Sequence, residues 1–417
     1  RDVAPSRGLG DVYKRQAYKE ALLTLGREKL AEYEEVILMN FTLAGPVCPL
    51  GPMFAAMDAR AELDFWGLTR HYAMQSRRFG GAVPEHLQSH FLALRPRLFN
   101  SDAFWDYWQQ MALPASYEQS VILHETRFTP YFAAKGYIWD TYVNTDDLCG
   151  VFVNPIMACP AELLQKRDCP FFKRRSLFTP YADELRRTDG CAAGELYRYV
   201  KAHTEFPVDL LLASLLQTQP MAALAKNLHW NYVIAEPAAE VPDLAALGLR
   251  LLRYTLPAAD PVTDWYNKKA SADADALLGC AAQLFEKKPL LGVLSPALPL
   301  WQGCAAARRT QWQRDARTLA EKAAVPVGSD PLPAPNCGWL LVREASFLDG
   351  IPPCTTQRDA WQLALTAQAA GYYAAAFETA AQAAARADVL DVYEADAARP
   401  AAVAKHLGRL IKHKLQK

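Results

Sequence analysis

Residues 85–91 read EHLQSHF, a stretch in which side chains able to form hydrogen bonds lead into an apolar run. Two related segments precede it: residues 36–46 read VILMNFTLAGP, and residues 63–69 read LDFWGLT. Each upstream segment is an apolar run that ends in polar residues and glycine, which is typical of a buried strand. The carboxyl ends of strands in an α/β sheet deliver polar side chains to one crevice. These segments therefore predict an α/β fold with a site at one sheet edge.

The neighbouring sequence predicts an alternation of helices and strands, which favours a sheet covered by helices. The expected strands are 36–39, 63–68, 89–94 and 137–143. We expect one helix over 102–111, capped by Ser101, and a longer helix over 116–135 that ends at Gly136.

Length and charge exclude several classes of protein. The 417 residues favour two domains, and the equal numbers of basic and acidic residues, 45 each, argue against a nucleic-acid-binding face. The nine cysteines form no CxxC pair, which indicates thiols of a reducing compartment. The longest nearly uncharged apolar stretch, 289–301, is interrupted by prolines and too short to span a bilayer, and no signal peptide is visible. We therefore expect a cytoplasmic protein.

The domain organisation is predicted from a shift in composition. Residues 17–234 carry the helix–strand alternation, and residues 235–270 read as a linker rich in alanine and proline. We expect 230–234 to be the last strand of the first domain. Residues 271–417 read as a smaller, helix-rich α/β region with strands at 290–294 and 338–342 and helices at 312–323, 360–385 and 401–414.

The three opening segments, in this order, resemble the rhamnan synthesis protein F family, a group of presumed glycosyltransferases that build rhamnose-containing cell-surface polysaccharides. The resemblance continues through residues 117–136, through 140–147 (DTYVNTDD) and through 169–176 (CPFFKRRS), then fades after about residue 234. It implies a glycosyltransferase A-type-like sheet, a nucleotide-sugar donor, and a glycan or lipid-linked glycan acceptor.

The beginning of the chain departs from that pattern. Residues 8–16 read GLGDVYKRQ and resemble a translated sequencing adapter, so residues 1–16 are predicted to be non-native. In the family, the tetrapeptide AYKE found here at 17–20 follows a donor-site loop and an opening strand–helix–strand unit. We therefore expect this chain to lack its first nucleotide-binding unit, and as given it is predicted to be an inactive fragment of an active protein.

The resemblance implies that Glu125 is the catalytic base. In many inverting transferases of this fold an acidic residue lies on a helix after the central strands, a few residues before a glycine, and Glu125 occupies a similar place ahead of Gly136. The alternative is an exposed helix glutamate paired with a nearby arginine.

Asn40 and Thr42 lie where such folds place an acidic metal-binding motif at a strand end. Phe41 stands where many family members carry Asp, and Phe cannot ligate Mg²⁺ or Mn²⁺, so the need for a metal is left open. A polar turn is the alternative interpretation. Asp64 is a remaining acid for the cleft, although it could simply cap a strand edge.

His86, Gln88 and Ser89 are predicted to bind sugar hydroxyls or a phosphate, while structural roles stay possible for each. A basic cluster of Arg70 and His71 with Arg77 and Arg78 lies in a predicted loop, where a guanidinium either closes over a pyrophosphate or is simply solvated. The basic run 173–175 and a carboxy-terminal stripe of Leu407, Leu410, Ile411 and Leu415 suggest peripheral contact with an anionic membrane at its inner face, with ordinary packing as the alternative.

The resulting hypothesis is an inverting glycosyltransferase that moves rhamnose from a nucleotide sugar onto a polysaccharide. One rival is a non-catalytic polysaccharide-assembly or carbohydrate-binding protein with a degenerate donor site, which Phe41 favours. A second rival is a transferase of a phosphate-containing group.

Overall fold

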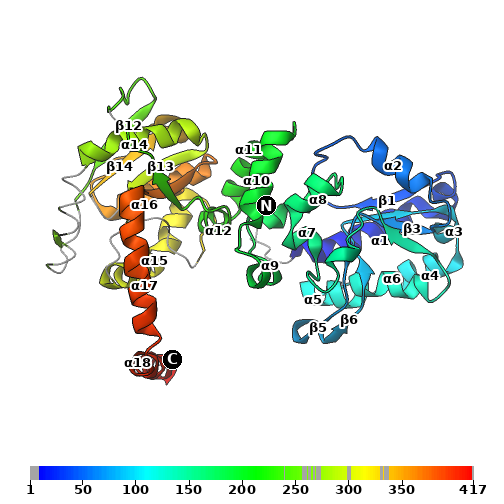
Figure 1. Ribbon diagram of the computed structural model, residues 1–417. Helices are drawn as coiled ribbons and strands as arrows, with labels where there is room; N and C mark the ends of the chain where they lie inside the picture. The colour runs from blue at the N-terminus through cyan, green and yellow to red at the C-terminus, as the bar shows by residue number, and fades with distance from the viewer. Residues whose placement is uncertain are drawn as a thin grey trace. The chain divides into compact units, whose positions relative to one another are not determined.

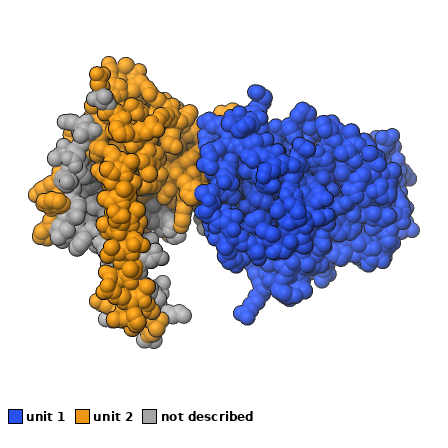
Figure 2. Space-filling view, viewed as in Figure 1, with its two compact units in different colours: residues 1–208 blue, residues 209–417 orange. Residues whose placement is uncertain are grey.

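The chain forms two compact units, residues 1–208 and 209–417, which Figure 2 colours blue and orange. The computed structural model describes residues 9–238, 240–255, 274–297, 302–328 and 338–415, together with positions 261, 264, 265, 268 and 332. Both units are mixed α/β, so the predicted fold class is confirmed at this level.

The main sheet of the first unit has four strands in the order β1-β8-β3-β9, of which β1 and β3 are labelled in Figure 1. β8 (Phe91–Leu94) runs antiparallel to β1 (Val36–Met39) and β3 (Phe65–Gly67), whereas β3 runs parallel to β9 (Trp139–Thr141). β1, β3 and β9 therefore end at the edge where β8 begins. The polar residues after β1 and before β8 lie at this shared edge.

Helices pack on both faces of this sheet because successive strand residues point to opposite sides. On one face Phe65 packs with the rings of α4 (Asp102–Gln110) and α6 (Thr126–Ala133). On the other face Trp66, fully buried, contacts Phe54 of α2 (Gly51–Asp58), and its indole N–H donates to Glu35 Oε1 at 2.7 Å.

The first unit contains further short elements. The helices are α1 (Leu9–Leu30), α3 (Pro96–Phe99), α5 (Tyr117–Ser120), α7 (Pro155–Ala158), α8 (Pro160–Lys166), α9 (Ala182–Arg187) and α10 (Ala192–His203). The 3₁₀ turns are η1 (Arg77–Phe79), η3 (Asp146–Leu148) and η4 (Arg174–Leu177). The paired strands are β2 (Leu43–Ala44) with β10 (Phe172–Lys173), β4 (Arg70–His71) with β7 (His86–Leu87), and β5 (Met74–Ser76) with β6 (Gly81–Val83).

Two predicted helix ends are confirmed, and one predicted helix is more complex. The Ser101 hydroxyl accepts the Phe104 N–H at 3.2 Å and caps α4. The predicted helix over 116–135 is divided into α5, a π-helix η2 (Val121–Glu125) and α6. Gly136, with φ of 81°, follows its end as predicted, because this left-handed conformation favours glycine.

The predicted strand 89–94 is also shorter than expected. Leu87 pairs with Arg70 in the small β4–β7 ladder, and the chain turns before β8 begins at Phe91. Ser89 and His90 therefore lie in a turn rather than within the strand.

The second unit contains a five-stranded sheet in the order β11-β15-β13-β14-β12, of which β12, β13 and β14 are labelled in Figure 1. Its strands are β11 (Tyr232–Ala235), β12 (Leu249–Arg253), β13 (Leu291–Pro296), β14 (Trp339–Arg343) and β15 (Tyr373–Thr379). Its helical elements are α11 (Val208–Thr218), which begins at the division between the units, α12 (Met221–Asn227), α14 (Ala274–Lys287), α15 (Gln302–Ala323), η5 (Glu344–Ser346), α16 (Gln357–Ala369), α17 (Ala380–Ala397) and α18 (Pro400–Leu415).

This sheet corrects two expectations about strand assignment. The strand near 230–234 does not close the first unit, because β11 pairs in parallel with β15 of the second sheet. The predicted linker 235–270 contains β12, which pairs antiparallel with β14, while residues 256–260 lie outside the described part.

The predicted helix over 360–385 is interrupted by β15. Gly371, with φ of 86°, follows α16, and residues 373–379 then lie between β11 and β13 in parallel pairing. Alanine favours helices, but helix propensity is a weak preference that burial between two strands overrides.

Phe132 tests the importance of the aromatic core of the first unit. The residue is fully buried, with its ring centroid 4.8 Å from that of Phe128. We expect Phe132→Ala to lower the free energy of unfolding by about 3–5 kcal/mol, because the substitution leaves a cavity that the sheet cannot close. Urea denaturation followed by tryptophan fluorescence measures the change. The matched control is Phe41→Ala, at a ring that is 64% exposed, with an expected effect below about 0.5 kcal/mol. Equal effects of the two substitutions would contradict this assignment of the core.

Candidate functional site

The polar cluster at the shared sheet edge begins in the turn after β1. The backbone N–H of Asn40 donates to the His90 carbonyl at 3.2 Å, and the Asn40 side-chain oxygen accepts the N–H of Thr42 at 3.1 Å and the Thr42 hydroxyl. Asn40 Nδ2 also donates to the Ser89 carbonyl at 3.4 Å. This Asx turn fixes residues 40–42 against the turn that precedes β8.

Glu125 reaches the same turn from the end of the π-helix. Its Oε1 accepts the backbone N–H of Ser89 at 3.2 Å, and the Ser89 carbonyl accepts the Tyr18 hydroxyl of α1 at 3.2 Å. Within the described part of the chain the Ser89 hydroxyl has no hydrogen-bond partner. The structure therefore brings Asn40, Ser89 and Glu125 together, as the sequence predicts for their positions.

Lys173 joins this cluster from a distant part of the chain. β10 pairs antiparallel with β2, so that Lys173 lies opposite Leu43, and the Arg174 N–H donates to the Thr42 carbonyl at 2.9 Å. Burial lowers the pKa of Lys173 to about 8, the Glu125 carboxylate opposes this shift, and the Arg175 guanidinium adds to it. Glu125 and Lys173 therefore act on each other electrostatically.

The members of this edge cluster share a degree of exposure that suits ligand contact. All are half-buried: Asn40, Thr42, Ser89, Glu125 and Lys173. A half-buried polar side chain can meet a ligand while its neighbours hold it in position. We call these residues the strand-edge site.

Two further predicted residues are buried beneath this site and serve the framework. Gln88 accepts the Thr69 hydroxyl at 2.8 Å and donates to Asn154 Oδ1 at 3.2 Å. His86 Nδ1 lies 2.7 Å from the Pro84 carbonyl, and its ring stacks on that of His71 with centroids 5.1 Å apart. These contacts hold in place the backbone that leads into β8.

Asp64 is not brought to the strand-edge site. It precedes β3, so it lies at the opposite end of the sheet, where its carboxylate accepts the Ile138 N–H at 2.7 Å and pairs with Arg97 at 2.5 Å. This placement corrects the expectation that Asp64 shares the cleft with Asn40 and Glu125. The physical reason is chain direction, because a residue before a strand and a residue after a parallel strand lie at opposite edges.

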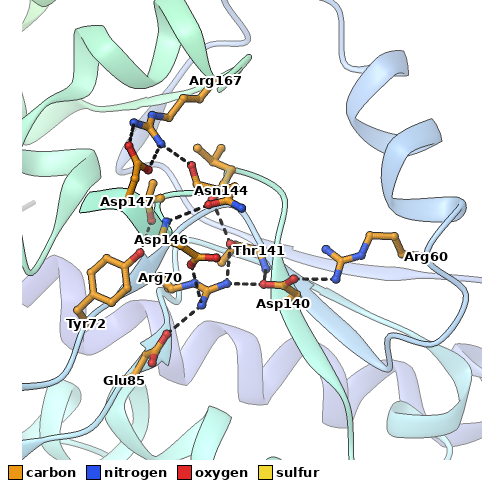
Figure 3. Close-up of polar contacts among 12 residues, drawn as sticks. Arg60, Arg70, Tyr72, Glu85, Asp140, Thr141, Asn144, Asp146, Asp147 and Arg167 are labelled. Atoms are coloured by element: carbon orange, nitrogen blue, oxygen red, sulfur yellow. Dashed lines mark hydrogen bonds and ion pairs between the residues drawn. The ribbon is translucent and has the colours of Figure 1, made fainter. Parts of the chain in front are cut away.

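A polar network around Arg70 was not predicted as such (Figure 3). The Arg70 guanidinium donates to Glu85 Oε1 at 3.0 Å, to the Asp140 carboxylate and to Thr141 Oγ1 at 3.3 Å, and it lies over the Trp139 ring. Its side chain is only 16% exposed. Arg70 is thus neither a solvated loop residue nor a cation available for a pyrophosphate.

The network continues into the segment after β9 (Figure 3). Arg167 binds both carboxylate oxygens of Asp147, at 2.6 and 2.8 Å, which lowers the pKa of Asp147, and it donates to the Asn144 carbonyl at 2.9 Å. The Tyr72 hydroxyl pairs with Thr145 Oγ1 at 2.8 Å. The acid-rich run 140–147 was the available signal, but its arginine partners lie far away in the sequence.

A separate hollow lies beside the β5–β6 hairpin. Its volume is about 570 Å³, and its lining includes Phe79, Ile122, Arg127 and Tyr131. Ile122 belongs to the same π-helix as Glu125, but neither Glu125 nor Asn40 lines the hollow. We assign it no role in the strand-edge site.

The donors at the strand-edge site do not form a ligand set for Mg²⁺ or Mn²⁺. The Asn40 oxygen is engaged by Thr42, and Phe41 offers no donor. Among the residues that the structure describes, no three His, Cys, Asp or Glu side chains converge to hold a metal ion. We therefore derive no step through a metal.

The fold and this edge define a mixed α/β protein with a half-buried polar site at the ends of its strands. Residues 11–245, more than half of the chain, match the family model described as Rhamnan synthesis protein F. The chain belongs to this family, which confirms the resemblance and implies a role in rhamnan polysaccharide synthesis. Comparison with curated proteins and with solved structures gives no significant match to either.

The described helices were also assessed for membrane insertion. None of them combines the length and the apolar character needed to cross a bilayer.

Arg70→Lys tests the network of Figure 3. A lysine keeps the charge but cannot reproduce the planar fork that joins Glu85 and Asp140, so we expect the free energy of unfolding to fall by about 1–3 kcal/mol. The matched control is Arg78→Lys, at an arginine 63% exposed and paired with Glu118, with an expected change below about 0.5 kcal/mol. Chemical denaturation measures both, and an unchanged Arg70→Lys midpoint would show that the network does not stabilise the fold.

Proposed function

We propose that this protein is a glycosyltransferase of rhamnan synthesis that transfers rhamnose from a nucleotide sugar to a growing polysaccharide, with inversion at the anomeric carbon. The observation that carries the proposal is the position of Glu125, whose carboxylate lies against the Ser89 N–H at the sheet edge that Asn40 and Lys173 also reach. The family's role in polysaccharide synthesis supports this reading.

The proposed reaction needs one base and a stabilised leaving group. The acceptor hydroxyl oxygen attacks the anomeric carbon and forms the new glycosidic C–O bond, while the bond from that carbon to the diphosphate oxygen breaks. The diphosphate leaves with the electron pair, and the acceptor proton passes to the Glu125 carboxylate. Inversion requires the base and the leaving group to lie on opposite sides of the sugar ring.

The remaining members of the strand-edge site are proposed to position the sugar. The Ser89 hydroxyl, the Thr42 side chain and the Asn40 amide lie around Glu125 and offer both donors and acceptors for hydroxyl groups. His86 and Gln88 act through Ser89, because their buried contacts fix the turn that carries it. In this proposal they are positioning residues.

The second candidate function is carbohydrate binding without catalysis. Phe41 is 64% exposed in the turn between Asn40 and Thr42, where a ring could stack on a sugar face. Such a protein would bind glycan through the strand-edge site and transfer nothing.

The proposed partners are a nucleotide sugar donor and a glycan or lipid-linked glycan acceptor, met on the cytoplasmic side. A peripheral membrane contact through α18 stays a prediction. Leu407 and Ile411 are 57% and 52% exposed, which is compatible with that contact, while the side chains of Leu410 and Leu415 lie outside the described residues.

Glu125→Gln tests the assignment of the base. The amide keeps the shape and still accepts the Ser89 N–H but cannot take a proton, so we expect transfer from a nucleotide-activated rhamnose to fall about 100-fold or more. In a version that carries the amino-terminal unit expected from the resemblance, product formation on a glycan acceptor measures the rate, and titration calorimetry with the sugar nucleotide measures binding, which is expected to persist.

The matched control is Glu118→Gln, at an exposed glutamate one helical segment earlier that pairs with Arg78. This variant is expected to keep the wild-type rate. Equal rates for wild type and Glu125→Gln would reject the base, whereas glycan binding without any transfer would favour the second candidate function.

A further inference from the structure

Lys173 is held at the strand-edge site by backbone pairing rather than by its charge. Phe172 is fully buried and packs against Phe206 with ring centroids 5.7 Å apart, while the β2–β10 ladder sets Lys173 opposite Leu43. Adjacent residues of a strand point to opposite sides. With Phe172 anchored in the core, the Lys173 side chain is directed to the opposite side of the strand.

The Lys173 ammonium has no structural acceptor in the described part of the chain. No hydrogen bond and no ion pair joins its Nζ to another described residue, and Glu125 acts on it without forming a direct pair. A half-buried ammonium without an acceptor costs free energy that a methionine of the same shape would not. The fold alone therefore gives no reason for a lysine here.

Two charged groups act on Lys173 from neighbouring elements. Glu125 of η2 raises the pKa of Lys173 and Arg175 of η4 lowers it, so one carboxylate and a second cation lie within electrostatic reach. β2, α7 and α8 also pack against β10 but contribute no charged group that acts on Lys173. Neither of these two charged groups supplies a hydrogen bond to the Lys173 ammonium within the described part of the chain.

We propose that Lys173 forms a phosphate-binding site at the strand edge, which receives the diphosphate of the substrate beside Glu125. This inference rests on the proposed function and deepens it, because it names a residue that stabilises the leaving group. An ammonium is a strong point-charge partner for a phosphate. The same chemistry would fit the diphosphate of a nucleotide sugar or that of a lipid-linked acceptor, and the test separates them.

The protonation of Lys173 gives the site a pH signature. With its pKa lowered to about 8, Lys173 is charged below that pH and loses its charge as the pH rises through it. Affinity for a phosphate is therefore expected to fall on the alkaline side. Arginine at this position would keep its charge throughout that range.

The test is titration calorimetry of the full chain with inorganic pyrophosphate, with nucleoside diphosphates and with farnesyl diphosphate. We expect Lys173→Met to weaken pyrophosphate binding about tenfold or more at about pH 7, because a charged hydrogen bond is lost, and Lys173→Arg to retain most of it. The matched control is Lys166→Met, at a lysine 67% exposed on α8, which is expected to bind as wild type does.

The pH dependence separates ligand binding from a purely structural role. Between about pH 7 and about pH 9.5 the wild type is expected to converge on the affinity of Lys173→Met, while Lys173→Arg stays nearly constant. In Glu125→Gln the fall is expected to begin at a lower pH, because the carboxylate that raises the pKa of Lys173 is gone. Stronger binding of nucleoside diphosphates identifies the donor as the source, and stronger binding of farnesyl diphosphate identifies the acceptor.

Two outcomes overturn the inference. One is equal pyrophosphate affinity of wild type and Lys173→Met, and the other is the same alkaline decline in wild type and Lys173→Arg. Pyrophosphate binding through Lys173 without sugar transfer would instead reject the proposed function and leave the phosphate site intact. Sugar transfer that Lys173→Met leaves unchanged would reject the site alone.

Discussion

The register of β8 between β1 and β3 is the constraint on which the strand-edge site depends. Met39 pairs with Phe91 and Gly67 with Leu92, so the turn after β1 and the turn before β8 face each other across one edge. A slip of one residue would exchange the two faces of β8 and bring each of its buried side chains against the packing of the opposite face. The apolar core therefore fixes the polar site, because Leu92 and Leu94 cannot leave it without a large loss of buried area.

The π-helix η2 places Glu125 at the sheet edge that this register creates. A π-helix, with its i→i+5 hydrogen bonds, carries its side chains to positions that a regular α-helix does not offer, and such segments are frequent at functional sites. Glu125 is the last residue of η2 and reaches the backbone of Ser89, whereas the following Thr126 is buried against the core. The regular α6 then continues with Phe128 and Phe132 in the aromatic cluster. One helical segment thus serves both the core and the edge.

Much of the first unit could be predicted because its signals are local. The Ser101 cap, the stop at Gly136 and the polar residues after β1 are read directly from neighbouring residues. The errors have a common cause, which is pairing between distant segments. β15 is rich in alanine yet lies between two strands, and β12 lies within a segment that its composition marks as a linker.

The contrast between local signals and contacts of distant segments also explains which site residues could be predicted from the sequence. Asn40 follows one predicted strand and Ser89 begins another, so chain direction alone brings both to one edge, whereas Glu125 lies within a predicted helix. Asp64 was misplaced because it begins its strand rather than ending it. The burial of Gln88 and His86 follows from partners at Thr69, Asn154 and His71 that no local pattern indicates. Lys173 reaches the site through the β2–β10 ladder, which joins segments with most of the first unit between them.

The positions of the residues around the strand-edge site determine which of them can supply positive charge there. A departing diphosphate concentrates negative charge, and a low-dielectric site must provide a fixed partner for it before the reaction starts. The turn 40–42 supplies none, since the Asn40 oxygen is committed to Thr42 and Phe41 offers only an aromatic ring. Arg70 supplies none either, because Glu85 and Asp140 already neutralise it. Among the described residues, the basic run that starts at Lys173 is the positive charge that both reaches Glu125 and lacks a structural acceptor at its first residue. Without a ligand, the partial burial of the Lys173 ammonium would only lower the stability of the fold. The proposed ligand phosphate would complete the ammonium's hydrogen bonds and so account for a charge where the packing would accept an apolar side chain.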